Sequence, residues 1–298
     1  MKSKLILSIL FIAACLQMNA KTTIKGVKHV VVIGCDGFGA YAYHKTNMPN
    51  LKKLAANGSW SIKARSVLPS SSAVNWASIL MSASPTIHGY TEWGSKTPEI
   101  PSAVISQYGK FPSIYTLIKE QMPKSKTAVI YSWEGIEYLL EKEIIDFVIP
   151  TKSDEELTTE KAIETILNQK PTFTFIHFDE PDHTGHAAGH DTPEYYTILE
   201  KVDNRIGRIV QAVKDAGIEK ETIIMIISDH GGIEKGHGGK TMQEVEIPIV
   251  IYGPGIKKGY EMKDVIIDYD YAATIAKILE LKIPQAWRGI PINEAFVK

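Results

Sequence analysis

Short, apolar, β-rich runs alternate with helical patterns along most of this 298-residue chain, and this alternation restricts the fold more than any other feature. The predicted strands are rich in Val and Ile and nearly continuous in apolar character, as strands are when both faces of a parallel sheet are covered. They span residues 28–35, 127–131, 172–178, 221–227 and 247–252. Helices are predicted over residues 48–57, 75–81, 112–121, 154–167, 193–216 and 269–281. The pattern predicts an α/β fold with a doubly wound, mostly parallel central sheet and helices on both faces.

The first twenty residues have the order of a secretory signal peptide. A positive start and an apolar stretch over residues 5–16 precede a short polar segment that ends at Ala20. At about 1.5 Å per residue, this stretch is too short to cross a hydrocarbon core of about 30 Å as a helix. We therefore expect residues 1–20 to be removed on export to the periplasm or outer membrane, leaving a single catalytic domain over 21–298. The alternative is a lipoprotein signal that ends before Cys15, which would then carry a lipid anchor.

Composition and charge exclude several classes of protein. With 44% hydrophobic and 22% charged residues, the chain is neither disordered nor collagen-like. Its formal net charge of -1 gives no general attraction to nucleic acid or to anionic membranes, so we expect no nucleic-acid polymer as a partner. After the apolar start, no stretch is long and apolar enough to span a bilayer. Two cysteines cannot form a disulfide scaffold.

Residues that bind metal ions well follow three of the predicted strands. Asp36 follows the first strand, the segment 179–186 (DEPDHTGH) follows the third, and Asp229 and His230 follow the fourth, with His237 shortly after. An open α/β sheet places its ligands beyond the carboxyl ends of its strands, so we expect these side chains to meet. Histidine and aspartate suit zinc, whereas closed structural zinc sites favour cysteine. The sequence therefore predicts a catalytic metal centre.

The candidate ligands are too many for one tetrahedral ion and suit two. One ion can be held by Asp182, His186 and His237. The other can be held by Asp36, Asp229 and His230, with one coordination position left open. Two ions about 4 Å apart are a common arrangement for in-line phosphoryl transfer. We therefore predict two divalent metal ions that act on a phosphate ester.

A nucleophile is expected in the serine-rich segment 68–78 (LPSSSAVNWAS), which precedes an apolar helical stretch. Ser72 would lie near a helix N-terminus, where free N–H groups and the helix dipole favour an anion. A serine hydroxyl is a poor nucleophile until a metal or a base lowers its pKa, and coordination to the ion near Asp36 would do this. The alternative interpretation is a serine-rich turn that caps the helix.

The chain resembles the type I phosphodiesterase/nucleotide pyrophosphatase branch of the alkaline phosphatase superfamily. The matching stretches are VVVIGCDGFGA, MPNLKKLAANG, SAVNWASIL followed by PTIHGY, DEPDHTGH, IISDHGG, and GHGG with the later IPIVIYGPGI. They come in the family's order and extend to about residue 255, and the tail LELKIPQAWRGIPINEAF is also similar. A single short motif would be weak support, but the ordered set is specific.

The resemblance implies an alkaline phosphatase-like fold with two zinc ions. It makes Asp36, Asp229 and His230 ligands of the zinc that also binds the oxygen of Ser72, and Asp182, His186 and His237 ligands of the other. It implies that Ser72 forms a covalent phospho-intermediate and that Asn75 donates a hydrogen bond to the phosphoryl oxygen on which charge develops. The family usually has Thr, an aromatic residue and Pro before this Asn. This chain has Ser72-Ala73-Val74, and the neighbouring Ser70 and Ser71 leave the register of the nucleophile open.

A small-molecule phosphodiester or nucleotide is the expected substrate. The chain has four arginines and none lies in a metal or nucleophile motif, which favours a diester over the more highly charged monoester. The alternatives are a phosphomonoesterase, a phosphonoacetate hydrolase, an ethanolamine phosphate transferase-like enzyme, or an exported metal-dependent protein that binds a phosphate ligand without turnover. Sulfatases need a Cys/Ser-x-Pro-x-Arg sequence, which is absent around Ser72.

Aromatic residues near the nucleophile are candidates for stacking on a nucleotide base. These residues are Trp76, Tyr90, Trp93 and Trp133. The alternative for each is ordinary core or loop packing. The segment 82–108 is rich in Gly, Pro and Ser, and we expect it to form a loop over the site.

Overall fold

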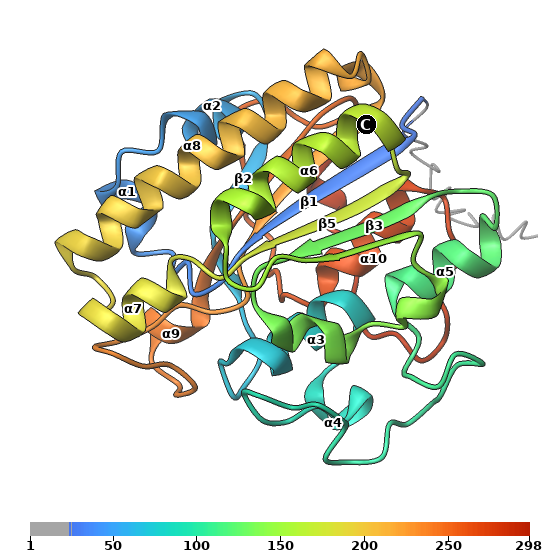
Figure 1. Ribbon diagram of the computed structural model, residues 1–298, viewed down its shortest axis with the longest axis horizontal. Helices are drawn as coiled ribbons and strands as arrows, with labels where there is room; N and C mark the ends of the chain where they lie inside the picture. Colours follow the sequence, from blue (N-terminus) through green and yellow to red (C-terminus); the bar gives the residue numbers. More distant parts are fainter. Residues whose placement is uncertain (1–23, 25) are drawn as a thin grey trace, which may run out of the picture.

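A mixed sheet forms the centre of the computed structural model, which describes residue 24 and residues 26–298 (Figure 1). The strand order is β4-β3-β5-β1-β6-β7-β2-β8. The strands are β1 (His29–Cys35), β2 (Ser59–Arg65), β3 (Thr127–Tyr131), β4 (Phe147–Pro150), β5 (Phe173–Phe178), β6 (Thr222–Ile227), β7 (Glu246–Tyr252) and β8 (Tyr260–Glu261). Strand β7 runs antiparallel to its neighbours β6 and β2, and the other neighbouring strands pair in parallel. The predicted mostly parallel α/β sheet is therefore confirmed.

Helices cover both faces of the sheet, as the apolar character of its strands predicts (Figure 1). The helices are α1 (Ala42–Lys45), α2 (Pro49–Ala56), α3 (Ser72–Met81), α4 (Pro85–His88), α5 (Ile114–Gln121), α6 (Glu155–Gln169), α7 (Asp182–Ala188), α8 (Pro193–Asp215), α9 (Met242–Val245) and α10 (Asp270–Ile278). Short 3-10 helices span Glu134–Leu139, Lys142–Ile144, Glu219–Glu221 and Asn293–Ala295. Apolar side chains of α3, α5 and α10 form one core with the sheet, and those of α2, α6 and α8 form a second core.

Local capping interactions determine where several of these helices begin. The Thr192 side chain accepts a hydrogen bond from the backbone N–H of Tyr195, and Pro193 is the first residue of α8. Ser113 and Thr116 form a reciprocal capping box at the start of α5. These signals explain why the predicted helices form close to their predicted positions.

Three strands were not predicted, each for a local reason. Strand β2 contains Lys63 and Arg65 and alternates buried with more exposed positions, unlike the continuous apolar runs of the strands that were predicted. Strand β4 is only partly buried at the edge of the sheet, and β8 has two residues. The segment 82–108 is irregular apart from α4, in agreement with its composition.

The predicted signal peptide over residues 1–20 and the alternative lipid-anchor site at Cys15 lie outside the described residues. Within the part of the chain that the structure describes, no helix has both the length and the apolar character needed to cross a membrane.

The parallel register brings the ends of three strands to one edge of the sheet. Cys35 of β1 lies opposite Phe178 of β5, and the preceding residue of β1 lies opposite Ile227 of β6. The backbone N–H of Asp36 donates to the carbonyl oxygen of Phe178 at 3.0 Å, and the N–H of Asp182 donates to that of Asp36 at 3.1 Å. The segments that follow β1, β5 and β6 are therefore adjacent, although they are far apart in the sequence.

Candidate active site

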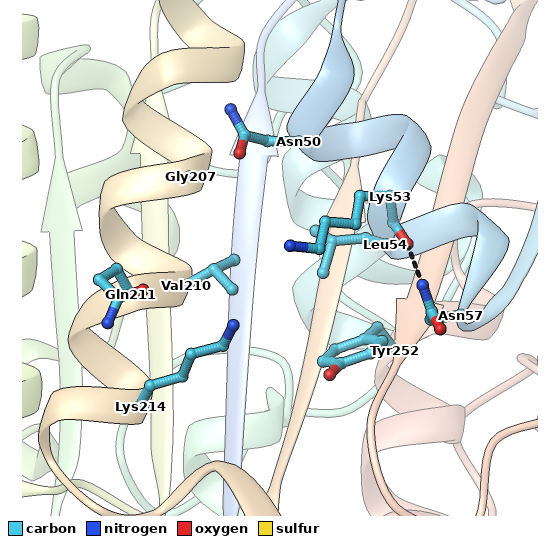
Figure 2. Close-up of a pocket in the computed structure, with 9 residues that line it drawn as sticks. All are labelled: Asn50, Lys53, Leu54, Asn57, Gly207, Val210, Gln211, Lys214 and Tyr252. Carbon is cyan, nitrogen blue, oxygen red and sulfur yellow. Dashed lines mark hydrogen bonds between the residues drawn. The ribbon is translucent and has the colours of Figure 1, made fainter.

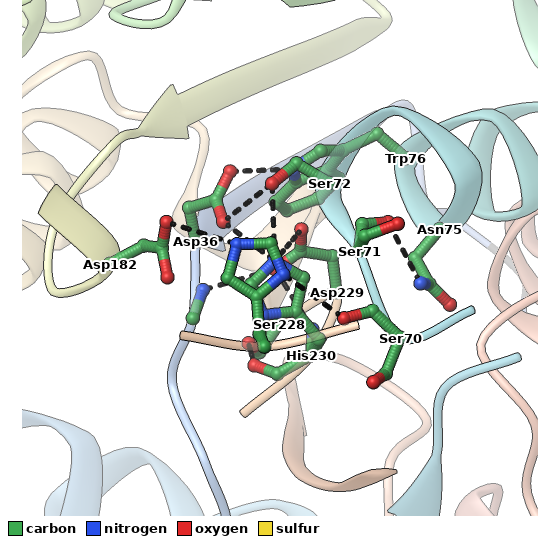
Figure 3. Close-up of polar contacts among 12 residues, drawn as sticks. Asp36, Ser70, Ser71, Ser72, Asn75, Trp76, Asp182, Ser228, Asp229 and His230 are labelled. Atoms are coloured by element: carbon green, nitrogen blue, oxygen red, sulfur yellow. Dashed lines mark hydrogen bonds and ion pairs between the residues drawn. The ribbon is translucent and has the colours of Figure 1, made fainter. Parts of the chain in front are cut away.

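Asp36, Asp229 and His230, here called the Asp36 group, meet just beyond the ends of β1 and β6 (Figure 3). His230 Nε2 lies 3.3 Å from Asp36 Oδ1 and 3.3 Å from Asp229 Oδ2, and all three side chains are buried. The backbone N–H groups of Gly37 and His230 donate to Asp229 Oδ1. The other oxygen, Asp229 Oδ2, accepts no hydrogen bond from the described residues, so it is free to bind a cation.

Asp182, His186 and His237, here called the Asp182 group, meet beside α7. Asp182 and His186 are one helical turn apart, so both side chains lie on the same side of α7. Asp182 Oδ2 lies 3.1 Å from His186 Nε2 and 3.7 Å from His237 Nε2, and the two nitrogens are 3.1 Å apart. The rings of His237 and His230 stack with their centroids 3.9 Å apart, which places the two groups side by side. The structure thus brings together both predicted ligand sets.

Hydrogen bonds to backbone carbonyls orient the three predicted histidine ligands. The Nδ1 atom of His186 lies 2.9 Å from Lys235 O, that of His237 lies 3.2 Å from Ser70 O, and that of His230 lies 2.7 Å from Gly231 O. A carbonyl oxygen only accepts, so each Nδ1 carries the hydrogen in these bonds. In the neutral rings, Nε2 then has a free lone pair directed at the carboxylates, which is the usual arrangement of metal-binding histidines.

The electrostatics of the two groups also fit divalent cations. Burial raises the pKa of Asp229 well above its usual value, and repulsion from Asp36 adds to this effect. Burial also opposes ionisation of Asp182, but hydrogen bonds from His186 and His190 outweigh it and hold the pKa of this carboxyl well below its usual value. The hydrogen bond to Asp182 raises the pKa of His186 to about 9. In the metal-free protein, a proton on His186 therefore supplies positive charge that a bound cation would otherwise supply.

Ser72 is the member of the serine run whose side chain joins the Asp36 group (Figure 3). It is the first residue of α3, and its Oγ lies 3.1 Å from His230 Nε2 and 3.5 Å from Asp36 Oδ1. The Oγ of Ser70 instead donates to Gly239 O at 2.7 Å. The Oγ of Ser71 is buried without a hydrogen-bond partner among the described residues. Of the three candidate registers, the geometry favours Ser72.

Asn75 is not directed at the two ligand groups, contrary to the role implied for it above. Its Oδ1 accepts from the backbone N–H of Val67 at 2.8 Å, and its Nδ2 donates to Pro69 O at 3.1 Å and to Ser71 O at 2.9 Å. Figure 3 shows the amide turned toward the serine segment. The residue is fully buried, and its amide hydrogens are used by the turn that precedes Ser72, so a hydrogen bond to a phosphoryl oxygen is not available in this arrangement.

The four aromatic residues predicted to stack on a base differ in exposure. Trp76 is fully buried, and its Nε1–H donates to Asp36 Oδ2 at 2.9 Å. Tyr90 is also fully buried, so the stacking prediction is wrong for both residues because neither ring face is open. Trp133 is partly buried against the core. Trp93 is 67% exposed, and its carbonyl oxygen accepts the N–H of Ala73 at 3.1 Å, which places it beside the first turn of α3.

Two buried histidines at the site were not predicted to have a role in it. His177 Nε2 lies 3.1 Å from Asp36 Oδ2, and His190 Nε2 lies 3.3 Å from Asp182 Oδ1. Each therefore contacts a carboxylate of one predicted ligand set. Both belong to the cluster of histidines that surrounds the DEPDHTGH motif, but the sequence alone does not distinguish a histidine that binds metal from one that contacts a ligand.

A separate hollow of about 240 Å³ lies between α2 and α8 (Figure 2). It is lined by Asn50, Lys53, Leu54, Asn57, Gly207, Val210, Gln211, Lys214 and Tyr252. Tyr252 pairs with Ile224 near the start of β6, whereas Asp229 follows the end of that strand. The hollow is therefore not part of the site formed by the two ligand groups.

Residues 30–236 match the family described as type I phosphodiesterase / nucleotide pyrophosphatase. Mouse ectonucleotide pyrophosphatase/phosphodiesterase family member 1 is 25% identical over 278 residues, which cover 85% of this chain and 30% of the relative. The chain therefore spans less than a third of that relative's length.

Solved structures that superpose on this chain include a protein named as an ectonucleotide pyrophosphatase/phosphodiesterase and one named as a sulfatase. An inactive variant of murine ectonucleotide pyrophosphatase/phosphodiesterase 5 in complex with AMP superposes with a TM-score of 0.74 at 15% identity, covering 91% of this chain and all of that chain. A 2-O GAG sulfatase superposes with a TM-score of 0.72 at 15% identity, covering 91% of this chain and 74% of that chain. These likenesses show the fold, which is alkaline phosphatase-like, as expected.

Proposed function

The chain belongs to the type I phosphodiesterase/nucleotide pyrophosphatase family, and we propose that it is a metal-dependent hydrolase that cleaves phosphodiester or nucleotide pyrophosphate bonds. One observation carries this proposal: Ser72 Oγ lies 3.1 Å from His230 Nε2, within the Asp36 group and beside the adjacent Asp182 group. Phosphoryl transfer needs a positioned nucleophile and positive charge on both sides of the phosphorus, and this arrangement provides places for both.

We propose that the Asp36 and Asp182 groups each hold one divalent cation. Aspartate and histidine donors suit several divalent ions, and zinc is our proposal because the family resemblance implies it. When bound, the two cations would neutralise the carboxylates, lower the pKa of the Ser72 hydroxyl and balance the charge of the phosphoryl group.

The chain's own residues would carry out the reaction in two steps. Ser72 Oγ attacks phosphorus, so that an Oγ–P bond forms while the bond to the leaving oxygen breaks. Asp36 and His230, whose Oδ1 and Nε2 atoms lie 3.5 and 3.1 Å from Oγ, would hold the cation that lowers the pKa of this hydroxyl, so the hydroxyl proton passes to solvent. In the second step, water attacks the phosphoserine, the Oγ–P bond breaks, and a proton from that water restores the Ser72 hydroxyl. Asn75 holds the preceding turn in place and so positions Ser72.

The positions of the arginines support a diester substrate. All four arginines lie among the described residues, and none pairs with either ligand group. Arg205 and Arg208 pair with glutamates of α6, Arg288 donates to backbone carbonyls near the C-terminus, and Arg65 lies on β2. A monoester dianion carries one more negative charge than a diester, and three of the four guanidinium groups are engaged away from the two ligand groups.

Trp93 is the aromatic residue best placed to contact a nucleotide base. It is exposed beside the first turn of α3, whereas Trp76 and Tyr90 are buried. The relative of known structure that binds AMP is consistent with a nucleotide substrate. We therefore propose that Trp93 stacks on the base or on another planar leaving group.

We also propose that residues 21–298 form one catalytic domain that works outside the cytoplasm, in the periplasm or at the outer membrane. The order of charged, apolar and small residues at the N-terminus supports export, and the curated relative is named as an ectoenzyme. The lipoprotein alternative with an anchor on Cys15 would give the same compartment.

Hydrolysis of bis-p-nitrophenyl phosphate and of p-nitrophenyl phosphate by the zinc-loaded protein tests the proposal. We expect the diester to be preferred, with activity lost in chelator and restored by zinc. Ser72→Ala should remove turnover while two zinc ions still bind, and Ser71→Ala, the neighbouring hydroxyl deletion, should retain it. A Ser72→Ala variant with normal turnover would refute the assignment of the nucleophile.

Other outcomes of the same assay distinguish the alternatives. A preference for the monoester would overturn the argument from the arginines and indicate a phosphomonoesterase. Stoichiometric metal binding without turnover of either ester, or of a panel of nucleotides and headgroup diesters, would favour the binding protein. Failure to bind metal at either group would refute the proposed function itself.

A further inference from the structure

His190 occupies a closed position between two parts of the site. It lies between the end of α7 and the start of α8, and it is 4% exposed. Its backbone N–H donates to Glu234 O at 2.6 Å, which joins the segment after α7 to the loop that carries His237. The ring therefore lies where the chain segments of both ligand groups approach each other.

Both ring nitrogens of His190 face oxygen atoms. Nε2 lies 3.3 Å from Asp182 Oδ1, and Nδ1 lies 3.2 Å from Glu234 O. A carboxylate oxygen only accepts hydrogen bonds, so Nε2 acts as the donor in the contact with Asp182. The contact with Asp182 is buried, where a hydrogen bond to a charged group is worth more than at the surface.

The two carboxylate oxygens of Asp182 therefore face different partners. Oδ2 faces His186 at 3.1 Å and His237 at 3.7 Å, within the Asp182 group. Oδ1 faces His190 on the other side. A carboxylate that could rotate freely would present either oxygen to the group, and the contact with His190 fixes which oxygen is presented.

We propose that His190 is a positioning residue that donates Nε2–H to Asp182 Oδ1 and so holds Oδ2 toward the metal-binding position of the Asp182 group. This inference rests on the proposed function, because it assumes that the Asp182 group holds a cation. Partners of this kind orient metal ligands, and their loss commonly costs about 10- to 100-fold in metal affinity.

Two glycines form the space that the His190 ring fills. A Cβ atom at Gly185, in the DEPDHTGH motif, would lie 2.4 Å from His190 Nε2, and a Cβ at Gly232, in the SDHGG motif, would lie 2.3 Å from the same nitrogen. Real Cβ atoms do not approach heavy atoms this closely, so any side chain at either position would displace the ring. A glycine from each ligand motif therefore admits the ring, which supports a specific place for His190 rather than incidental packing.

A pair of amide variants separates the two contacts of the ring. In His190→Gln, the side-chain amide reaches the position of Nε2 and can still donate to Asp182. In His190→Asn, the amide reaches the position of Nδ1 beside Glu234 O, but the donor to Asp182 is lost. Both variants introduce the same functional group into the same buried space. The control variant is His183→Asn, because His183 lies on the same helix, α7, as Asp182 but is exposed.

The measurement is zinc affinity at each of the two sites, obtained by competition with a chromophoric chelator and by metal analysis of the protein. We expect His190→Asn to weaken one of the two sites by about 10- to 100-fold and His190→Gln to restore most of that affinity. The control variant should keep the wild-type affinity at both sites. Far-UV circular dichroism and thermal unfolding of the metal-free variants would show that they fold.

The outcomes separate this inference from the proposed function. Wild-type protein that binds no zinc pair would refute the proposed function. If the wild type binds two ions and His190→Asn binds both equally well, the positioning role is wrong and the proposed function stands. If His190→Gln is the weaker binder and His190→Asn is normal, the contact that matters is the one to Glu234, and the inference is refuted.

Discussion

The turn before Ser72 depends on the buried amide of Asn75, and this dependence gives a quantitative prediction. Asn75→Ala removes three hydrogen bonds to the backbone of Val67, Pro69 and Ser71 at a position with no exposed surface. Each such bond contributes about 1 kcal/mol net, and buried backbone groups left without partners cost at least as much. We therefore expect the free energy of unfolding to fall by about 3 kcal/mol. For a chain of this size, that corresponds to a fall in Tm of roughly 5 °C.

Urea unfolding of the zinc-loaded protein, followed by tryptophan fluorescence, measures this loss. Asn75→Asp is the second variant: it is nearly isosteric, but it places a carboxylate oxygen against the carbonyls of Pro69 and Ser71, where the wild type has donor hydrogens. It should be at least as unstable as Asn75→Ala. Asn57→Ala is the matched control, because Asn57 is exposed on the surface and donates one bond to Lys53 O, and its loss should cost less than about 0.5 kcal/mol.

The opposite result would support the role implied by family resemblance. If Asn75 donates to a phosphoryl oxygen, its removal would lower kcat by about 10²- to 10³-fold and leave the unfolding curve unchanged. A loss of less than about 1 kcal/mol in Asn75→Ala, together with such a fall in kcat, would refute the reasoning from the hydrogen bonds.

Three further predictions concern the binding site and its support. The hydrogen bond to Asp182 holds the pKa of His186 at about 9, above its ordinary value, so zinc must displace a proton below that pH. We expect zinc affinity at one site to rise from pH 7 to 9, and calorimetry in two buffers should detect up to one proton released; no proton release would contradict this. Trp93→Ala should raise KM for a nucleotide substrate several-fold and leave KM for a small aliphatic diester unchanged, and equal effects on both would exclude base stacking. Burial lowers the pKa of His88 to about 3, so the unfolded state binds the extra proton and stability is lost as pH falls below about 6.5. In His88→Gln, which can still donate to Ser78, the His88 contribution of about 1 kcal/mol between pH 6.5 and 5.5 should disappear from urea unfolding measured at these two pH values.

The sequence predicts the strands whose local apolar pattern matches their place inside the sheet. Continuous apolar runs predict β1, β3, β5 and β6, because a strand that is covered on both faces carries apolar side chains on both of them. Strand β2 was missed, because its alternating, charged sequence resembles a solvated segment until β7 and β8 are known to flank it. No local pattern reports which distant strand becomes a neighbour.

In the candidate site, the sequence predicts where residues lie along the chain and the sheet, but not where their side chains point. Asp36, Asp229 and Asp182 could be predicted, because each follows a strand and parallel strands end at one edge of the sheet. Spacing placed Trp76 and Asn75 near Ser72, which is correct, but it did not indicate where their side chains point. Trp76 turns inward to Asp36, and Asn75 turns back to the serine turn. The direction of a side chain on α3 depends on the loop packed against it, and that packing is not encoded in local spacing.

One contact has a thermodynamic consequence for how the site would load with metal. The carbonyl that orients His237 belongs to Ser70, two residues before the nucleophile, and the carbonyl that orients His186 belongs to Lys235, two residues before His237. An ion in the Asp182 group would thus restrict the loop that carries Ser72 into the Asp36 group. Ordering a segment once lowers the entropic cost of the next event that needs it ordered, so we expect the two ions to bind with positive cooperativity. Linkage makes this coupling reciprocal: whichever ion binds first strengthens the other by the same factor.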